Sequence, residues 1–533
     1  MTAEKPFLSF DKEVDHLATL FSLFDKTAQK MPEQVALVFS DNKIEYGRCL
    51  EAINRLAQGL KDLGIEKGDR VALMLPNVPH FCISYYAILR LGAVVVPINI
   101  MYQESDIRYH LTDSTASAII AWEGFSSKVI PAVRSTSTCK EILLLGNKVP
   151  NNTRPLTLLM AKSRPIEGAI PVEADDLAVI NYTAGISDEA LGAELTHAAL
   201  LANASTIRDM YHITSEEKLI SVLPLFHPLG QTLVMNTSFL VGATVVLMPR
   251  FEPNEVVKAI QEHNVTFLAA VPDMYRSLVN TSTETSTPSL KYCLSYGGRL
   301  SAELMNEFET KFDTLVLEAY GLTEAGPLVA ANRLDRDRKP GSVGLPLVGV
   351  EIQIRDEEGN IQKPLESGEI WVKSPSLMRG YFNRPEESAK RLKDGWLFTG
   401  DMGYLDEDHY LFIQDRKEDI ILKGGFHIFP REVENVLLQH EAVEEVSVIG
   451  VPDKVQGWEV KAYVVLKKDH SATAEELIEF CRQTLPVYKT PKYLEIRTIL
   501  PKSATGRVLK RVLRNESIEN RNMAKKSNSI NKK

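Results

Sequence analysis

Residues 182–197 have the frame of a phosphate-binding loop that lacks its usual charge. Residues 177–180 are apolar enough for a buried strand, and Thr196 with the residues after it is typical of a helix start. A loop between a strand and a helix start points backbone N–H groups at an anion. Two glycines remain for close approach to a phosphate, whereas the expected glycine, proline and lysine are replaced. The retained glycines are Gly185 and Gly192. The replacing residues are Asp188, Ala190 and Leu191.

The replaced residues oppose the binding of phosphates that must leave. Leu191 carries no charge, and the carboxylate of Asp188 repels a phosphate oxygen about 4 Å away by roughly 1–4 kcal/mol, depending on the effective dielectric. Aspartate at a position that favours positive φ also adds strain, although it tolerates that region better than most residues. Because about 1.36 kcal/mol of barrier is a factor of ten in rate, we expect a reaction that expels phosphate to be slow.

Helical and strand periods alternate along most of the chain. An apolar helical face over residues 50–63 is followed by a short buried strand at 71–75, and the pattern repeats with a helix at 83–91 and a strand at 94–96. This alternation predicts an α/β fold with a mostly parallel sheet covered on both faces. Loops at the carboxyl edge of such a sheet bind ligands. Further predicted elements are strands at 177–180, 219–223, 243–248, 266–271 and 314–318 and a helix at 254–263.

The pattern changes after about residue 415. Strands at 445–449, 461–466 and 493–496 and a helix at 474–485 predict a smaller α+β domain. We therefore divide the chain into a large N-terminal domain of layered α/β subdomains, residues 1–415, and a small α+β C-terminal domain, residues 416–514. Residues 515–533 are rich in Asn, Ser and Lys, which predicts a disordered basic tail. Contact of its lysines with an acidic membrane surface stays open, and a solvated terminus is favoured.

Composition excludes several classes of protein. The chain has 533 residues and a formal net charge of −9, which argues against nucleic acid as a general partner. Neither an apolar run long enough to span a membrane nor an apolar signal segment is present. The five cysteines are scattered and odd in number, which suits a reducing compartment better than a disulfide framework or a zinc site. We therefore predict a cytoplasmic protein.

Eight further motifs, in order along nearly the whole chain, resemble those of the adenylate-forming (AMP-binding) enzymes. The resemblance is strongest to acyl-CoA synthetases of the fatty-acid and coumarate type. Each motif alone is a weak signal, but their order and spacing together are specific. The motifs occupy residues 64–71, 223–227, 295–298, 319–324, 396–401, 415–416, 423–430 and 501–507.

The resemblance implies a two-step ligase that uses ATP, Mg²⁺ and coenzyme A. A carboxylic acid and ATP first give an acyl-adenylate and pyrophosphate. The small domain then swings, and the thiolate of coenzyme A displaces AMP to give a thioester. A medium or long fatty acid fits the similar segments, and an aryl acid remains an alternative.

The resemblance also implies roles for the residues that would hold the nucleotide. Asp401 accepts hydrogen bonds from the ribose hydroxyls, and Arg416 donates to the same sugar. Tyr320 stacks on adenine. The backbone at Gly297, Gly298 and Gly321 approaches the base, and the first residues of the phosphate loop that would hold the nucleotide are Thr183 and Gly185.

Other implied roles concern the reacting groups. Thr323 donates to the α-phosphate, and Glu324 supplies an oxygen ligand for Mg²⁺. His227 borders the acyl group and the path of the thiol. Glu418 lies at a hinge, and Gly424 with Gly425 lines the pantetheine tunnel. Arg507 replaces the lysine that bridges the carboxylate and the α-phosphate during adenylation, and a planar guanidinium is a poor substitute for a compact ammonium.

These departures leave three functions open. The protein is a working acyl-CoA ligase with a compensated loop, a partner that forms thioesters from acyl-adenylate made by another enzyme, or a non-catalytic protein that binds acyl groups or nucleotides. Simpler roles also remain for single residues: His227 in a packed core, Asp401 in a turn and Glu324 on the surface. We predict an acyl-CoA ligase whose adenylation half-reaction is impaired. Weak peripheral contact with a membrane stays possible in all three cases.

Overall fold

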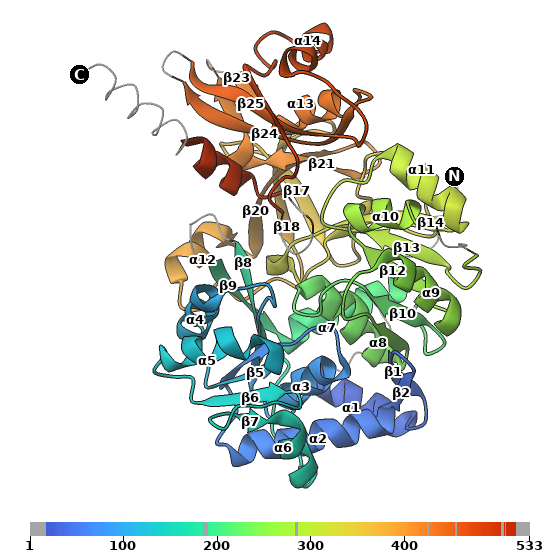
Figure 1. Cartoon of the computed structure of the whole chain (residues 1–533), viewed down its shortest axis with the longest axis vertical. Helices are drawn as coiled ribbons and strands as arrows, with labels where there is room; N and C mark the ends of the chain where they lie inside the picture. The colour runs from blue at the N-terminus through green and yellow to red at the C-terminus, as the bar shows by residue number, and fades with distance from the viewer. Residues whose placement is uncertain are drawn as a thin grey trace. The chain divides into compact units, whose positions relative to one another are not determined.

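The computed structural model describes residues 18–184, 190–282, 286–423, 426–453, 456–502, 506 and 508–518. The chain divides into two compact units, one of Met1–Glu351 with Val372–Leu397 and one of Ile352–Trp371 with Phe398–Lys533. Figure 1 labels the helices and strands. The mixed α/β class predicted from the sequence is confirmed, and the first unit is built on two large sheets.

A seven-stranded sheet occupies the first half of the first unit. Its inner strands pair in parallel, and β9 at one edge runs antiparallel to β8. The order across the sheet is β7 (Arg154–Pro155), β6 (Glu141–Leu145), β5 (Ala118–Trp122), β3 (Arg70–Met74), β4 (Val94–Pro97), β8 (Leu177–Ala184) and β9 (Ala190–Thr196).

A nine-stranded sheet combines the first two strands of the chain with strands from residue 218 onward. Its central strands are parallel, and the last connections at both edges are antiparallel. The order is β16 (Leu345–Pro346), β15 (Ala330–Ala331), β14 (Leu315–Tyr320), β13 (Tyr292–Ser295), β12 (Phe267–Ala270), β10 (Lys218–Ser221), β11 (Thr244–Leu247), β1 (Val35–Phe39) and β2 (Asn42–Glu45).

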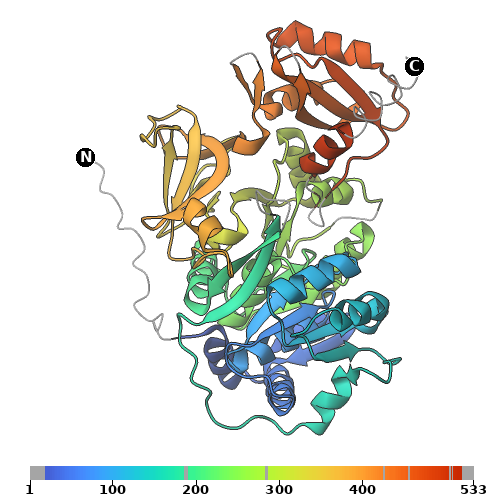
Figure 2. The same ribbon diagram turned by 90° about the vertical axis from the view of Figure 1, so that its left-hand side faces the viewer.

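Amphipathic helices bury their apolar faces on these sheets. The N-terminal helices pack over the blue and cyan strands in Figure 2. Phe308 on α11 and Tyr275 on α10 are buried against β12–β14 in one core cluster. The helices of this unit are α1 (Leu20–Lys30), α2 (Tyr46–Asp62), α3 (Pro79–Arg90), α4 (Glu104–Asp113), α5 (Ser126–Arg134), α6 (Leu156–Lys162), α7 (His197–Met210), α8 (Thr237–Val241), α9 (Pro253–His263), α10 (Pro272–Val279), α11 (Ala302–Phe312) and α12 (Pro385–Arg391).

The C-terminal half of the second unit is the α+β arrangement that the sequence predicts. One sheet has the order β23 (Phe426–Ile428), β22 (Ile421–Lys423), β25 (Gly457–Leu466), β24 (Val443–Asp453), with β26 (Tyr493–Arg497) also paired to β25. The helices α13 (Pro430–Leu437) and α14 (Ala474–Thr484) bury Val433, Leu437, Leu477 and Cys481 in its core. A further sheet contains β17 (Glu351–Arg355), β18 (Gly368–Lys373), β20 (Trp396–Leu405), β19 (Leu392–Lys393) and β21 (Leu411–Arg416).

The predicted disordered tail begins inside a helix. Residues 510–518 are helical, Leu513 is fully buried, and the carboxylate of Glu516 lies 2.7 Å from the guanidinium of Arg497. Apolar and ionic contacts therefore order residues 515–518. The rest of the predicted tail, residues 519–533, lies outside the described residues.

The prediction of a strand, a loop and a helix over residues 177–197 is wrong for residues 190–196. Residues 190–196 form strand β9, which pairs with β8 from Ala184↔Ala190 to Leu177↔Thr196. Thr196 caps α7 as predicted, its hydroxyl accepting from the Ala199 N–H at 3.1 Å. Strand β9 therefore stands between residue 189 and the start of α7, so the helix N-terminus does not directly follow residues 185–189. The buried alternation of Leu191, Ala193 and Leu195 favours the strand.

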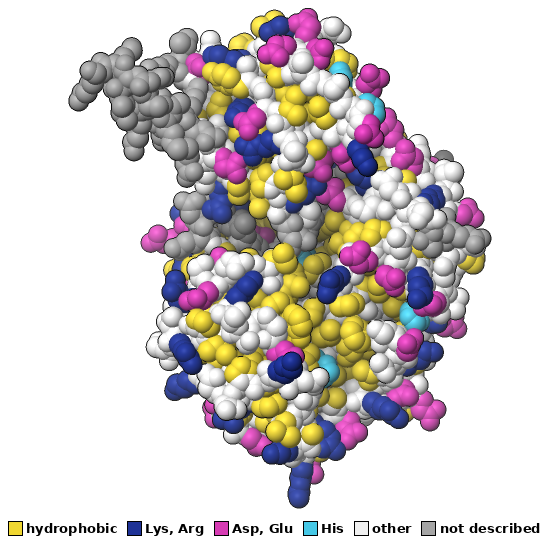
Figure 3. Space-filling model, in the orientation of Figure 1, with side chains coloured by type: hydrophobic (Ala, Val, Ile, Leu, Met, Phe, Trp, Pro, Cys, Tyr) yellow, Lys and Arg dark blue, Asp and Glu magenta, His cyan; other side chains and the backbone are white. Residues whose placement is uncertain are grey.

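Charged side chains lie on the surface (Figure 3), and the cysteines are buried. Acidic and basic side chains are interspersed over the face in Figure 3. Within the ranges that the structure describes, no helix is both long and apolar enough to cross a membrane. All five cysteines are buried free thiols.

The buried His197 makes the fold sensitive to acid. Its side chain is inaccessible, and burial lowers its pKa to about 4, from an ordinary value of 6.5. Between pH 6.5 and 4 the unfolded chain binds a proton that the folded chain does not. The free energy of unfolding is therefore not reduced by His197 above about pH 6.5, and it falls as the pH drops towards 4.

The free energy of unfolding should fall between pH 7 and pH 4.5. We expect His197→Asn to make this fall smaller by up to about 3 kcal/mol, since a shift of one pKa unit corresponds to about 1.36 kcal/mol. Asparagine keeps an acceptor for the Leu20 N–H, which Nδ1 of His197 now accepts at 3.3 Å. Urea unfolding at pH 7 and pH 4.5 measures the difference, with His470→Gln at an exposed position as the control for removing a histidine. An unchanged difference between the two pH values would contradict the assignment.

Candidate active site

A buried carboxylate, Glu324, joins three segments that are distant in the sequence. It lies in the short helix η3 (Thr323–Ala325), directly after β14, and only 8% of the residue is exposed. Its Oε1 accepts hydrogen bonds from the Tyr381 hydroxyl at 2.8 Å and from the Thr183 hydroxyl at 3.5 Å. A buried charge needs such partners. The structure thus brings together two predicted site residues, Thr183 and Glu324, and adds Tyr381.

Tyr381 is held by a backbone segment that extends the hairpin of β8 and β9. Phe382 donates its N–H to the Gly192 carbonyl at 2.8 Å, and Tyr381 bridges to Ala193. Burial and then the charge of Glu324 raise the pKa of the Tyr381 hydroxyl well above its usual value. The hydroxyl therefore stays protonated and donates a hydrogen bond to the Glu324 carboxylate. Sequence reasoning missed this residue because a tyrosine in a loop pattern more often packs than binds.

Leu191 lies on the same face of the hairpin as Thr183. The two residues are paired directly across β8 and β9, so their side chains project from one face. The Thr183 hydroxyl also lies 3.5 Å from the Leu191 carbonyl oxygen. The Leu191 side chain is buried, at 5% exposure. The residue at the expected lysine position therefore faces the side on which Glu324 lies, and it contributes apolar surface there.

The predicted adenine and phosphate segments meet at one edge of the nine-stranded sheet. Strands β13 and β14 are parallel neighbours with Ser295 opposite Glu318, so the loops that follow them leave the same carboxyl edge. Tyr320 ends β14 and is largely buried. Gly297 and Gly298 follow β13, whereas Gly321, Thr323 and Glu324 follow β14. This convergence of motifs agrees with the sequence expectation.

Two of these glycine positions differ in the space that they leave for a side chain. A Cβ at Gly321 would lie 1.8 Å from the Pro327 carbonyl oxygen, so a side chain there collides with backbone. A Cβ at Gly298 would make an ordinary contact of 3.4 Å with the Pro272 ring. Gly297 has a φ of +83°, which favours glycine.

His227 also follows a strand of this sheet, β10. Asn77 fixes the loop because its side-chain amide donates to the Leu223 carbonyl at 2.9 Å and accepts from the Leu225 N–H at 2.8 Å. The Leu229 N–H donates to His227 Nδ1 at 3.3 Å, which leaves the hydrogen of the neutral ring on Nε2. Burial lowers the pKa of His227 to about 4. At neutral pH His227 is therefore uncharged, and it offers an N–H donor and an apolar ring, but no cation.

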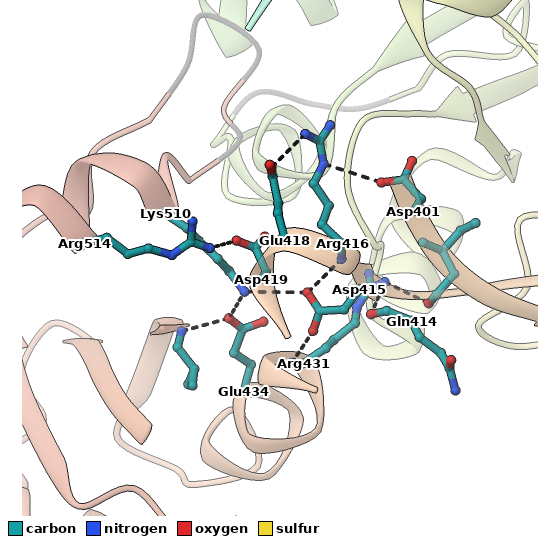
Figure 4. Close-up of polar contacts among 12 residues, drawn as sticks. Asp401, Gln414, Asp415, Arg416, Glu418, Asp419, Arg431, Glu434, Lys510 and Arg514 are labelled. Carbon is teal, nitrogen blue, oxygen red and sulfur yellow. Dashed lines mark hydrogen bonds and ion pairs between the residues drawn. The ribbon is translucent and has the colours of Figure 1, made fainter. Parts of the chain in front are cut away.

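Asp401 and Arg416 lie together in the second unit (Figure 4). They are paired across β20 and β21, and the Arg416 Nε lies 3.4 Å from Asp401 Oδ1. The Arg416 Nη1 lies 3.3 Å from Glu418 Oε1. Arg416 and Glu418 are about one-third and two-fifths exposed, so this cluster can donate to and accept from a bound sugar.

The segment after Arg416 is tied to the C-terminal helix. Lys510 Nζ lies 2.8 Å from Glu434 Oε1 and 3.8 Å from Asp415 Oδ1, and Arg514 pairs with Asp419. Burial raises the pKa of Asp415, and the charge of Lys510 partly offsets that effect. Figure 4 shows these carboxylates and cations alternating around the predicted hinge.

Four predicted site residues, Gly185, Gly424, Gly425 and Arg507, lie outside the described residues, as does Asp188. Within the described ranges, no group of three or more His, Cys, Asp or Glu side chains could hold a metal ion. Glu324 is therefore not part of such a group among the described residues. This fits Mg²⁺, which binds through one or two carboxylates together with water and substrate phosphates.

Comparison with known proteins places the whole chain in one family. Residues 24–382 match the model of the AMP-binding enzyme family, and residues 432–507 match that of the AMP-binding enzyme C-terminal domain. A long-chain-fatty-acid–CoA ligase of Bacillus subtilis is 38% identical and covers 98% of this chain and 99% of its own length. The corresponding ligase of Salmonella typhimurium is 34% identical over 94% of this chain and 95% of its own length.

A solved structure with the same fold was crystallised with nucleotide. It is the ATP-bound MatB of Rhodopseudomonas palustris, which has 29% sequence identity and a TM-score of 0.87. The alignment covers 94% of this chain and 99% of that protein. The large N-terminal domain with a small C-terminal domain is therefore shared with solved relatives.

The glycine geometry predicts a contrast between two alanine variants. We expect Gly321→Ala to lower the melting temperature by several degrees, because the backbone of Pro327 must move to admit a Cβ. Gly298→Ala should melt within about one degree of the parent, because its Cβ makes only an ordinary contact. Differential scanning calorimetry of both variants measures the contrast. Equal melting temperatures would show that the turn after β14 is not packed as described.

Proposed function

Since the chain belongs to the AMP-binding enzyme family and is an acid–CoA ligase of the AMP-forming type, we propose that it joins a long-chain fatty acid to coenzyme A using ATP. Formation of the acyl-adenylate is its slow half-reaction. The names of the bacterial relatives support the fatty acid as substrate. The observation that carries the proposal is the cluster of Thr183, Glu324 and Tyr381 with the uncharged Leu191 on the same side.

The first half-reaction transfers the adenylyl group. A carboxylate oxygen of the fatty acid forms a bond with the α-phosphorus of ATP, and the bond from that phosphorus to the bridging oxygen breaks. The electron pair leaves on pyrophosphate, and no proton is transferred. Negative charge grows on the leaving phosphates, so nearby cations lower the barrier. Leu191 provides none, which is why we propose a slow step.

The groups proposed to hold the retained part of the nucleotide are well formed. Asp401 and Arg416 suit the two ribose hydroxyls, because one accepts and the other donates. The ring of Tyr320 suits adenine, and Gly297 and Gly298 let the backbone approach the base. The hydroxyl of Thr323 suits the α-phosphate. The missing charge at position 191 should therefore lower the affinity for AMP less than it lowers the affinity for ATP.

Glu324 is the residue proposed to hold Mg²⁺. Its Oε1 accepts both hydrogen bonds, and among the described residues no donor reaches Oε2. When bound, the ion would neutralise charge on the phosphates. Tyr381 and Thr183 orient the carboxylate by donating hydrogen bonds to it.

The second half-reaction forms the thioester. The sulfur of coenzyme A bonds to the acyl carbon, the bond from that carbon to the AMP oxygen breaks, and the thiol proton passes to solvent. His227 is neutral at physiological pH and is proposed to border the acyl group as an N–H donor. Gly424 and Gly425 are proposed to line the thiol path, and Arg507 is proposed to act only in adenylation. The lid that carries them is proposed as residues 416–514.

The first expected outcome separates the two half-reactions. Synthetic palmitoyl-AMP with coenzyme A should release AMP at least about tenfold faster than palmitate, ATP and coenzyme A do together, because roughly 1–3 kcal/mol of electrostatic stabilisation is missing from adenylation alone. Chromatography of AMP and palmitoyl-CoA measures both rates. A parallel panel of laurate, benzoate and coumarate tests the acid.

Each other result selects an alternative. Equal rates in both assays would refute a slow adenylation step. Release of AMP from palmitoyl-AMP with no turnover of ATP would indicate the partner that uses acyl-adenylate made elsewhere. Absence of AMP in either assay would indicate a non-catalytic binding protein. Preference for coumarate or benzoate would replace the fatty acid by an aryl acid.

Restoring the missing cation should accelerate adenylation. We expect Leu191→Lys to raise the rate of ATP–pyrophosphate exchange by about tenfold or more, since a charge placed beside the leaving phosphates acts mainly in the transition state. Leu191→Met is the matched control of similar volume without charge. The rate with palmitoyl-AMP and coenzyme A should stay within about twofold in both variants. If methionine accelerates exchange as much as lysine does, charge is not what the position lacks.

A further inference from the structure

The hairpin of β8 and β9 fixes which side chains surround position 191. Leu191 lies opposite Thr183, and Ala193, two residues along the same strand, lies opposite Tyr381. Alternate residues of a strand share a face, and directly paired residues project together. The side chains of Thr183, Leu191 and Tyr381 therefore project to one side, where Thr183 and Tyr381 both reach Glu324.

Helix α12 folds back onto this group. The Tyr381 N–H donates to the Ser388 hydroxyl at 2.8 Å, which fixes one face of the helix against the tyrosine backbone. Arg391 ends the helix three residues after Ser388 and so lies on the same face, one turn on. Burial and Glu324 raise the pKa of the Tyr381 hydroxyl, whereas the charge and hydrogen bonding of the Arg391 guanidinium lower it, so Arg391 and Tyr381 are neighbours. The result is a chain of contacts from Arg391 through Tyr381 to Glu324.

Neighbouring cations are engaged elsewhere. Arg384 pairs with Asp113 at 2.5 Å, and the Tyr182 hydroxyl donates to the same carboxylate at 2.7 Å. Tyr182 precedes Thr183 in β8 and so projects from the opposite face of the hairpin. Lys390 is exposed and pairs with Glu387 at 2.7 Å. Among the basic residues that the structure describes on α12, Arg391 is the one whose contacts lead to Glu324.

We infer that Arg391 contacts the departing phosphates of ATP and supplies, from a different part of the chain, the positive charge that Leu191 does not. A guanidinium offers up to five N–H donors, so it can keep its contact with Tyr381 and still donate to phosphate oxygens. In the step proposed above, it would stabilise the pyrophosphate that leaves with the electron pair of the broken bond. The inference rests on the proposed function and explains why adenylation is slow without being absent.

The experiment compares Arg391→Met with Lys390→Met, its exposed neighbour on the same helix. We expect Arg391→Met to lower ATP–pyrophosphate exchange at least about tenfold, the change that about 1.4 kcal/mol produces. The rate with palmitoyl-AMP and coenzyme A should stay within about twofold. Lys390→Met should change neither rate. Arg391→Lys should retain part of the exchange, because it keeps a charge.

A binding measurement makes the test independent of catalysis. Calorimetric titration with AMP and with Mg·ATP gives the ratio of the two affinities for the parent and for each variant. We expect Arg391→Met to weaken ATP at least about fivefold while AMP is unchanged, since AMP lacks the departing phosphates. If the parent makes no thioester but this shift occurs, the proposed function fails and the placement of Arg391 stands.

Three results would overturn the inference. The first is unchanged exchange and an unchanged affinity ratio in Arg391→Met. The second is an equal fall in both half-reactions together with a lower melting temperature that Arg391→Lys also shows, which would indicate a structural role. The third is full additivity of Arg391→Met and Leu191→Lys in the rate of ATP–pyrophosphate exchange. If the two cations contact the same phosphates, Arg391→Met must lower that rate less in the Leu191→Lys protein than in the parent.

Discussion

The burial of the Glu324 carboxylate is the constraint on which the site depends. A carboxylate that is 8% exposed is stable only when hydrogen-bond donors are fixed around it. Those donors come from β8, through Thr183, and from the segment that pairs with β9, through Tyr381. The carboxylate itself follows β14 of the other sheet. One buried side chain therefore ties the hairpin edge of the seven-stranded sheet to the carboxyl edge of the nine-stranded sheet.

This arrangement explains why the two half-reactions can be affected differently. Tyr320, Gly297, Gly298, Asp401 and Arg416 are placed by strand pairing and tight turns. These residues are proposed to bind the base and the sugar, which remain in the acyl-adenylate. The changes at Asp188 and Leu191 are proposed to affect the binding of the phosphates that leave. A chain can lose charge at the second set without disturbing the packing that holds the first, because Leu191 is accommodated as an ordinary buried apolar residue.

Much of the fold and part of the site follow from local sequence patterns. The strands at β3, β4, β10, β12 and β14 and the helices α2, α3 and α9 match their periodicities, and the order of motifs identified the family. The strand β9 was missed because glycine and threonine around it resemble a loop leading to a helix. The alternation of Leu191, Ala193 and Leu195 was the signal that could have found it.

Residues that act through long-range contacts could not be predicted in this way. Asn77 holds the loop of His227 from nearly 150 positions away, and Tyr381 reaches Glu324 across 57. Neither residue type nor spacing marks these roles. The pKa values of His197 and His227 were equally hidden, because burial lowers them and burial is a property of the folded chain.

We propose that the protein holds the sugar and base of a nucleotide better than it holds the phosphates that must leave. The calorimetric affinities of the unmodified protein for AMP and for Mg·ATP under the same conditions test this proposal. We expect AMP to bind at least as tightly as ATP. An affinity for ATP ten or more times higher than for AMP would contradict it.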